Sequence, residues 1–136
     1  MITRHSRPNA RRIVLALLAL LLFGSSGCGK KEVTLTGGKP VSYWVQALRG
    51  SDARSRKKAA FELGNVGPAD PAVLPALLAG LDDHDPVVRR EVVLGLVKLG
   101  PAASEAVPKL VILRQKDRDP KIREYAARAI DKLEAK

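Results

Sequence analysis

Few side chains in the sequence have the types and spacing that catalysis or metal binding requires. The chain of 136 residues has two histidines and one cysteine. His5 lies in a basic N-terminal segment, and His84 lies in the acidic turn Asp82-Asp83-His84-Asp85. A nucleophile–base site needs Ser or Cys beside a histidine, and the sequence suggests no such pairing. The turn could ligate a cation, but its spacing matches no calcium loop, and Asp is common where helices begin. We therefore expect no catalytic residue, no metal site and no cofactor.

Basic residues are the more informative group. The chain has 24 Lys and Arg against 14 Asp and Glu, a net charge of +10, which favours an anionic partner. Aromatic residues make up only 4% of the chain and form no stacking platform for bases. On a helix, Arg54, Lys57 and Lys58 share one face. We predict that this face binds a partner; the alternative is an ordinary solvated surface.

The N-terminus has the features of an export signal. Residues 1–12 hold four arginines and no acid, and the eleven residues 13–23 are all apolar. A helix of that length covers about 16 Å, roughly half the hydrocarbon thickness of a bilayer. The run therefore favours a secretory signal rather than a spanning helix.

The end of this segment, Gly-Ser-Ser-Gly-Cys at residues 24–28, resembles a bacterial lipoprotein signal. The resemblance implies cleavage after Gly27 and a diacylglycerol on Cys28, although Ser25 stands where the pattern prefers an aliphatic residue. Two or three acyl chains would hold the protein on a membrane, because each buried methylene contributes about 0.8 kcal/mol. By the same resemblance, Gly29 after the cysteine implies that the lipoprotein is sorted to the outer membrane, if the cell has one. The alternatives are an ordinary secretory signal and an uncleaved anchor.

The predicted organisation has three parts: a signal peptide over 1–27, a lipidated cysteine with a flexible tether over 28–40, and a repeat domain over 41–136. Gly37, Gly38 and Pro40 predict the tether. From Cys28 onward the net charge is +6, a moderately basic surface.

One pattern repeats three times after the tether. Asp52-x-x-x-Arg56, Asp85-x-x-x-Arg89 and Asp119-x-x-x-Arg123 recur at intervals of 33 and 34 residues. Apolar residues follow each arginine at the spacing of one helical stripe, and Gly-Pro closes the first two copies. We predict helices at about 41–49, 53–66, 72–82, 86–99, 103–115 and 120–134.

These copies resemble short HEAT-like repeats of the type named after phycobilisome lyases. The resemblance covers about 41–136, with repeats at about 41–68, 72–101 and 103–136. It implies an all-α fold, a right-handed α-solenoid of three helix pairs. The family includes scaffolds, adaptors and a few enzymes, so it implies little about chemistry.

The repeated charges have a structural interpretation. Asp52, Asp85 and Asp119 are placed to cap helices, with Pro86 and Pro120 at the first helical position. Arg56, Arg89 and Arg123 lie one turn later, and we expect them to reach an aspartate or a carbonyl of an adjoining repeat. The prediction is a structural ladder of Asp and Arg along the stack.

The ends of a short repeat stack need capping. The fifth position after each arginine holds Phe61, Leu94 and then Arg128, which predicts that the last helix turns this side to water. Tyr43 and Trp44 lie on the first helix. They either close the core or contact a partner, and we include both among the candidate partner-binding residues.

The sequence thus predicts a membrane-anchored, non-catalytic scaffold or adaptor of the bacterial cell envelope, with its domain outside the cytoplasm. Its partner is an unknown protein bound through the solenoid surface, and its membrane contact is the lipid anchor. A lyase-like or chaperone protein acting on a bound ligand is one alternative. A basic solenoid that binds nucleic acid is the other, and export argues against it.

Overall fold

The residues that the computed structural model describes, 35–135, form three pairs of α-helices. The first helices of the pairs are α2 (Val41–Ala47), α4 (Val73–Gly80) and α6 (Val107–Lys116). The second helices are α3 (Ala53–Val66), α5 (Pro86–Leu99) and α7 (Pro120–Glu134). Short 3₁₀ helices, η1 (Gly67–Ala69) and η2 (Gly100–Ala106), join successive pairs. The predicted all-α fold is confirmed.

The second helix of each pair begins and ends where the sequence predicts, whereas the first helices are shorter. The largest difference is α6, which begins at Val107 instead of 103. Residues 100–106 form η2 instead, in which Pro101 follows the first residue and Ala103 has a φ of −97° and a ψ of 17°. This conformation at Ala103 interrupts the regular helix.

An aspartate precedes each of the second helices and satisfies one of its free amides. The carboxylates of Asp52, Asp85 and Asp119 accept hydrogen bonds from backbone N–H groups at 2.8, 2.7 and 2.8 Å. The first amides of a helix have no intrahelical acceptor, so a side-chain oxygen at this position stabilises the helix start.

Glycine ends two of these helices. Gly67 and Gly100 have φ values of 64° and 61° with ψ values of −150° and −142°. Residues with a side chain rarely adopt this combination, and the proline that follows each glycine cannot continue the helix. The chain therefore leaves the second helix sharply and turns into the next pair.

A two-stranded hairpin precedes α2. Strand β1 (Leu35–Thr36) pairs with β2 (Lys39–Pro40) in antiparallel register, and Gly37 and Gly38 form the turn with φ values of 52° and 71°. Positive φ at both central residues suits a tight hairpin turn. The sequence assigns residues 35–40 to a flexible tether; that part of the assignment is wrong, because Gly-Gly here makes a turn.

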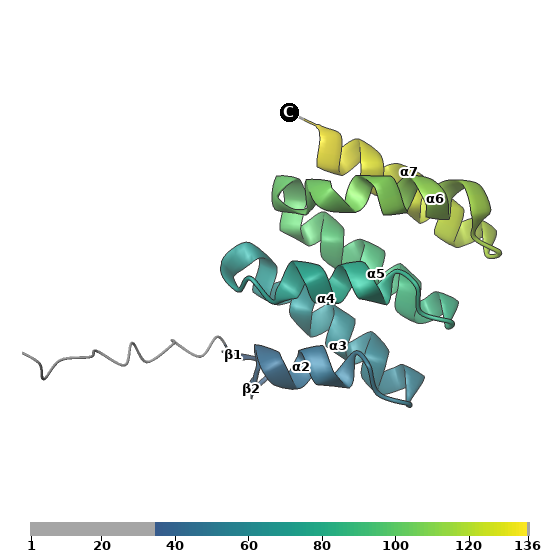
Figure 1. The fold of residues 1–136 in the computed structure, drawn as a ribbon. Helices are drawn as coiled ribbons and strands as arrows, with labels where there is room; N and C mark the ends of the chain where they lie inside the picture. Colours follow the sequence, from purple (N-terminus) through teal and green to yellow (C-terminus); the bar gives the residue numbers. More distant parts are fainter. Residues whose placement is uncertain (1–34, 136) are drawn as a thin grey trace, which may run out of the picture. The chain divides into compact units, whose positions relative to one another are not determined.

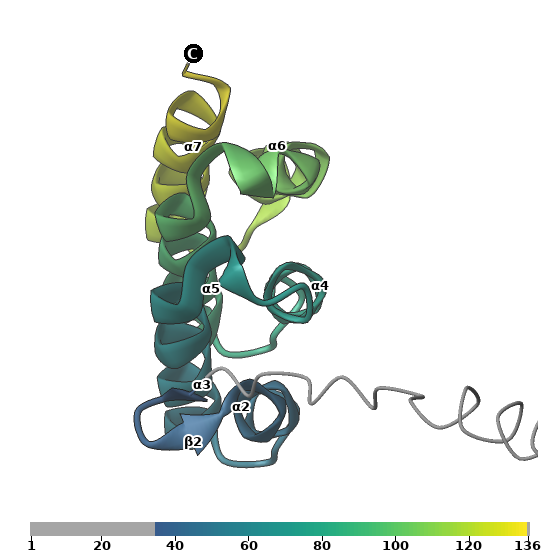
Figure 2. The same ribbon diagram turned by 90° about the vertical axis from the view of Figure 1, so that its left-hand side faces the viewer.

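The helices lie in two layers (Figures 1 and 2). Helices α3, α5 and α7 stack in one column, and α2, α4 and α6 lie beside them in the other. Because each pair adds one helix to each layer, equivalent residues of successive pairs form rows along the stack. The repeat spacing therefore decides which charged residues lie next to one another along the stack.

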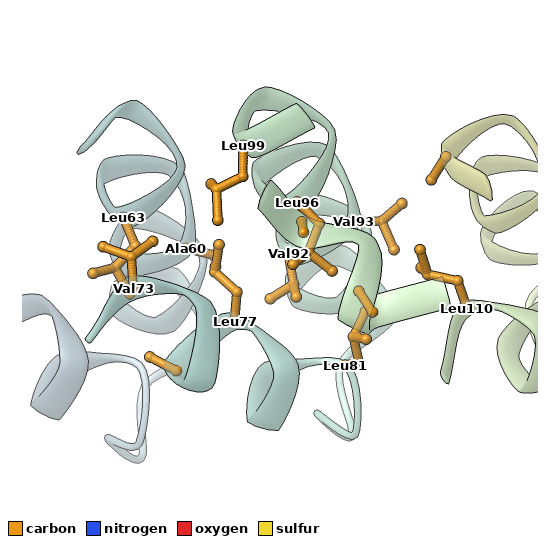
Figure 3. Packing of buried hydrophobic residues seen from close by; sticks show 14 of the residues in the cluster. Ala60, Leu63, Val73, Leu77, Leu81, Val92, Val93, Leu96, Leu99 and Leu110 are labelled. Carbon is orange, nitrogen blue, oxygen red and sulfur yellow. The ribbon is translucent and has the colours of Figure 1, made fainter. Parts of the chain in front are cut away.

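Aliphatic side chains fill the space between the layers (Figure 3). Leu63 of α3, Leu77 of α4 and Leu96 of α5 are 0% exposed, and Leu110 of α6 continues the same core. Leucine and valine at helical spacing thus join all three pairs into one hydrophobic core.

Glycine permits the closest approach between α3 and α5. A Cβ atom added to Gly64 would lie 2.7 Å from the Cα atom of Gly95. The two backbones are in contact at this point, and a larger side chain would force them apart.

None of the helices among residues 35–135 has the length and apolar character that a membrane span requires.

Candidate partner-binding surface

Arginine residues connect each helix pair to the next. Arg56 of α3 donates from Nε and Nη2 to the two carboxylate oxygens of Asp83, at 2.7 and 3.0 Å. Its Nη1 donates to the carbonyl oxygens of Gly50 and Ser51. Arg56 is 3% exposed, so nearly the whole side chain is held inside the structure. Two parallel bonds between guanidinium and carboxylate combine strength with a fixed geometry.

The same arrangement recurs one repeat later. Arg89 donates to Asp117 at 2.8 and 2.7 Å and to the carbonyl oxygens of Asp83 and His84. Of these contacts, Arg123 makes only those to the backbone: its Nη1 donates to the carbonyl oxygen of Asp117 at 2.7 Å. No acidic side chain among the described residues pairs with Arg123. The three arginines thus serve the structure of the stack.

The pKa values of the two paired aspartates are lowered. Burial raises the pKa of Asp83, but the hydrogen bonds from Arg56 and from the backbone N–H of Asp85 outweigh it, so the pKa lies below its ordinary value of 3.8. Burial opposes the bonds from Arg89 and from the backbone N–H of Asp119 in the same way at Asp117, whose pKa is also lowered. Both carboxylates are therefore ionised at neutral pH.

Asp83 and Asp117 are not the aspartates that the sequence pattern predicts for the ladder. The predicted ones, Asp52, Asp85 and Asp119, cap helices and form no ion pair with the arginines among the described residues. The partners are Asp83 and Asp117, two positions earlier. The repeated Asp-x-Asp-Pro at 83–86 and 117–120 is the signal that could have identified them.

The three aspartates of the acidic turn at residues 82–85 each make a contact within the protein. Asp83 binds Arg56, Asp85 caps α5, and Asp82 pairs with Lys109. A groove of about 700 Å³ separates this turn from the corresponding turn before α7. Within residues 35–135, no group of three or more His, Cys, Asp or Glu is arranged to hold a metal ion.

The basic side chains of α3 differ from the ladder arginines. Arg54, Lys57 and Lys58 are exposed, and none of them forms an ion pair with a described residue. The Nζ atom of Lys58 lies 5.5 Å from the centroid of the Trp44 ring. The structure thus places the three predicted cations together on one side of α3, adjoining the aromatic residues of α2.

Trp44 closes the core and is not a surface contact. It is 4% exposed, and its indole nitrogen donates to the carbonyl oxygen of Thr36 at 2.8 Å. The hydroxyl of Thr36 in turn donates to Glu62 at 2.8 Å. The assignment of Trp44 to partner binding is therefore wrong, because the hairpin covers it.

Tyr43 is available at the surface. It is 47% exposed, packs edge-on against Trp44 with ring centroids 4.9 Å apart, and lies under the Nζ of Lys39 at 5.4 Å. Through Trp44 and Lys58 it adjoins the basic side of α3.

The sequence pattern predicts only a capping role for the position of Phe61, whose side chain is 45% exposed on α3. The Nζ of Lys98 on α5 lies 4.4 Å from the centroid of its ring and donates to Asn65 at 2.8 Å. In the last repeat, Arg128 occupies the equivalent row position, is largely exposed and pairs with Glu124. We name the surface formed by Arg54, Lys57, Lys58, Phe61 and Lys98 the α3 surface.

Cys28 and the rest of the predicted signal lie outside the described residues, so the structure bears on neither.

Residues 41–131 match the family model described as HEAT repeats. This range includes all three helix pairs up to the last turn of α7. No curated protein matches the chain at a significant level.

Proposed function

Because the chain belongs to the HEAT-repeat family, we propose that it is a non-catalytic scaffold that binds a protein through the α3 surface. We further propose that Cys28 carries lipid and anchors the scaffold to a membrane of the bacterial cell envelope, with the domain outside the cytoplasm. HEAT repeats suggest protein interaction in general; the anchor and the location rest on the N-terminal sequence.

The observation that carries the proposal is the contrast between two sets of cations on one helix. Arg56 is buried and fully paired, whereas Arg54, Lys57 and Lys58 are exposed without ion pairs among the described residues. The exposed set therefore takes no part in the ion pairs that join the helix pairs. Uncompensated charges beside an exposed aromatic ring favour a partner of opposite charge.

The anchor is tested by replacing the cysteine. We expect Cys28→Ser to move the protein from the detergent phase to the aqueous phase and to leave a heavier, uncut chain, because both lipid attachment and signal cleavage require the thiol. If both forms partition identically and have the same mass, the anchor is absent.

The binding surface is tested by site-specific photocrosslinking in intact cells. A benzophenone amino acid replaces Phe61 on α3 or, as the matched control, Ile112 on α6, which is 52% exposed. We expect a discrete protein adduct at position 61 and none at 112. Equal adducts at both positions, or adducts to nucleic acid at 61, would contradict the proposal. Turnover of a substrate that one substitution on the α3 surface abolishes would also contradict it.

A further inference from the structure

A cleft lies between α3 and α5 beside the α3 surface. It has a volume of about 430 Å³ and is lined by Arg54, Lys57, Lys58 and Phe61 from α3 and by Glu91 from α5. The cleft is thus lined by one aromatic ring, three cationic side chains and one carboxylate.

Glu91 is the unusual member of this set. It is 9% exposed, and no described residue donates a hydrogen bond to its carboxylate or forms an ion pair with it. The carboxylate oxygens stay open to the cleft without a hydrogen-bond donor from the described residues, so a cationic donor brought to them from outside would gain a charge-assisted bond.

The fold does not require glutamate at this position. The equivalent row positions are Lys58 in the first repeat and Tyr125 in the third. Glu91 is therefore specific to the middle repeat, where it lines the cleft. The ring of Phe61, which also lines the cleft, already contacts the cationic Nζ of Lys98. The surroundings of Glu91 therefore suit a second positively charged group.

The surrounding cations restrict what can enter. A lone positive group would be repelled by Arg54, Lys57 and Lys58, whereas a purely acidic one would be repelled by Glu91. A segment that presents a positive side chain between carboxylates avoids both problems. Its carboxylates pair with the cations that line the cleft, and its positive side chain reaches Glu91.

We propose that this cleft binds a lysine or arginine side chain of an acidic peptide segment of the partner, with Glu91 as its counter-ion. Arg54 and Lys57 pair with the flanking carboxylates. The inference rests on the proposed scaffold function and specifies the chemistry of its partner.

The test uses fluorescence anisotropy of dye-labelled peptides titrated with the full chain in detergent. One peptide is Asp-Glu-Lys-Glu-Asp, and its control has norleucine at the centre. We expect the lysine peptide to bind about tenfold more tightly, equivalent to roughly 1.4 kcal/mol. Glu91→Gln should abolish this preference, and the matched charge change Glu105→Gln, at an exposed position of η2, should retain it.

Equal binding of both peptides to the unaltered chain, or a preference that survives in Glu91→Gln, would overturn the inference. So would a loss of folding stability in Glu91→Gln, because that result would assign the carboxylate an internal role. Failure of this inference is distinguishable from failure of the scaffold function: crosslinking at position 61 but not at 112 would persist in the first case and disappear in the second.

Discussion

Arg56 and Asp83 form a two-bond ion pair between consecutive helix pairs, with Nε–O and Nη2–O distances of 2.7 and 3.0 Å. Arg89 and Asp117 repeat it one step along the stack. Each pair joins a helix to the turn before the next second helix. The stack is therefore held by its core between the layers and by charge pairs along one edge.

Removing one member of the first pair should be costly. The side chains of Arg56 and Asp83 are 4% and 7% exposed, so Asp83→Ala leaves a buried guanidinium without its counter-ion. We expect the free energy of unfolding in urea to fall by about 3 kcal/mol or more. Arg128→Ala breaks the exposed pair with Glu124 and should cost less than about 1 kcal/mol. Equal losses in the two variants would contradict the structural role of the ladder.

Acid should destabilise the protein through the same carboxylates. The pKa values of Asp83 and Asp117 are lowered in the folded state, so their contribution to stability is complete above the unfolded pKa of about 3.9. It is lost as the pH falls through the folded values. We expect the unfolding free energy to decline below about pH 4, and to decline less steeply in Asp83→Asn. Urea titrations at a series of pH values from about 2 to 7 measure both slopes. An identical slope in the variant would exclude Asp83 as a source of the acid sensitivity.

The contact between Gly64 and Gly95 predicts a steric effect. A methyl group on Gly64 would meet the backbone of α5 at 2.7 Å, where nothing can rotate away. Gly64→Ala should lower the free energy of unfolding by about 1–3 kcal/mol, although alanine favours helices. Asn65→Ala, at the exposed neighbouring position, is the control and should cost less. A more stable Gly64→Ala variant would show that the two helices are further apart than described.

Trp44 provides an optical test of the hairpin. It is the sole tryptophan of the chain and is 4% exposed beneath β1. The folded protein should therefore emit at short wavelength and resist quenching by acrylamide, and Thr36→Gly should increase the quenching by loosening the contact with Glu62. Efficient quenching of the unaltered protein would contradict the covering of Trp44.

Much of the fold follows from the spacing of a few residues. The Asp-x-x-x-Arg repeat locates the starts of α3, α5 and α7, and the closing Gly-Pro locates the ends of α3 and α5, because caps and terminators act locally. The start of α6 does not follow, since Pro101 can stand at the start of either a 3₁₀ helix or an α-helix.

The candidate site was less predictable because it depends on packing between helices. Arg54, Lys57 and Lys58 share a face by helical spacing alone, which the sequence reveals. The pairing of Arg56 with Asp83 instead depends on the path of the turn between α4 and α5. The enclosure of Glu91 depends on how closely α5 approaches α3, and no sequence period encodes it.

The central claim is that the exposed cations of α3 bind a partner while the buried arginine beside them maintains the fold. The most direct measurement is the yield of the protein adduct at position 61 in a variant with Arg54→Glu, Lys57→Glu and Lys58→Glu. The control carries Arg114→Glu, Lys116→Glu and Arg118→Glu, the same charge change at exposed positions on and after α6. We predict that the adduct disappears in the first variant and persists in the second, with both folded by circular dichroism. An adduct of equal yield in both variants would contradict the account.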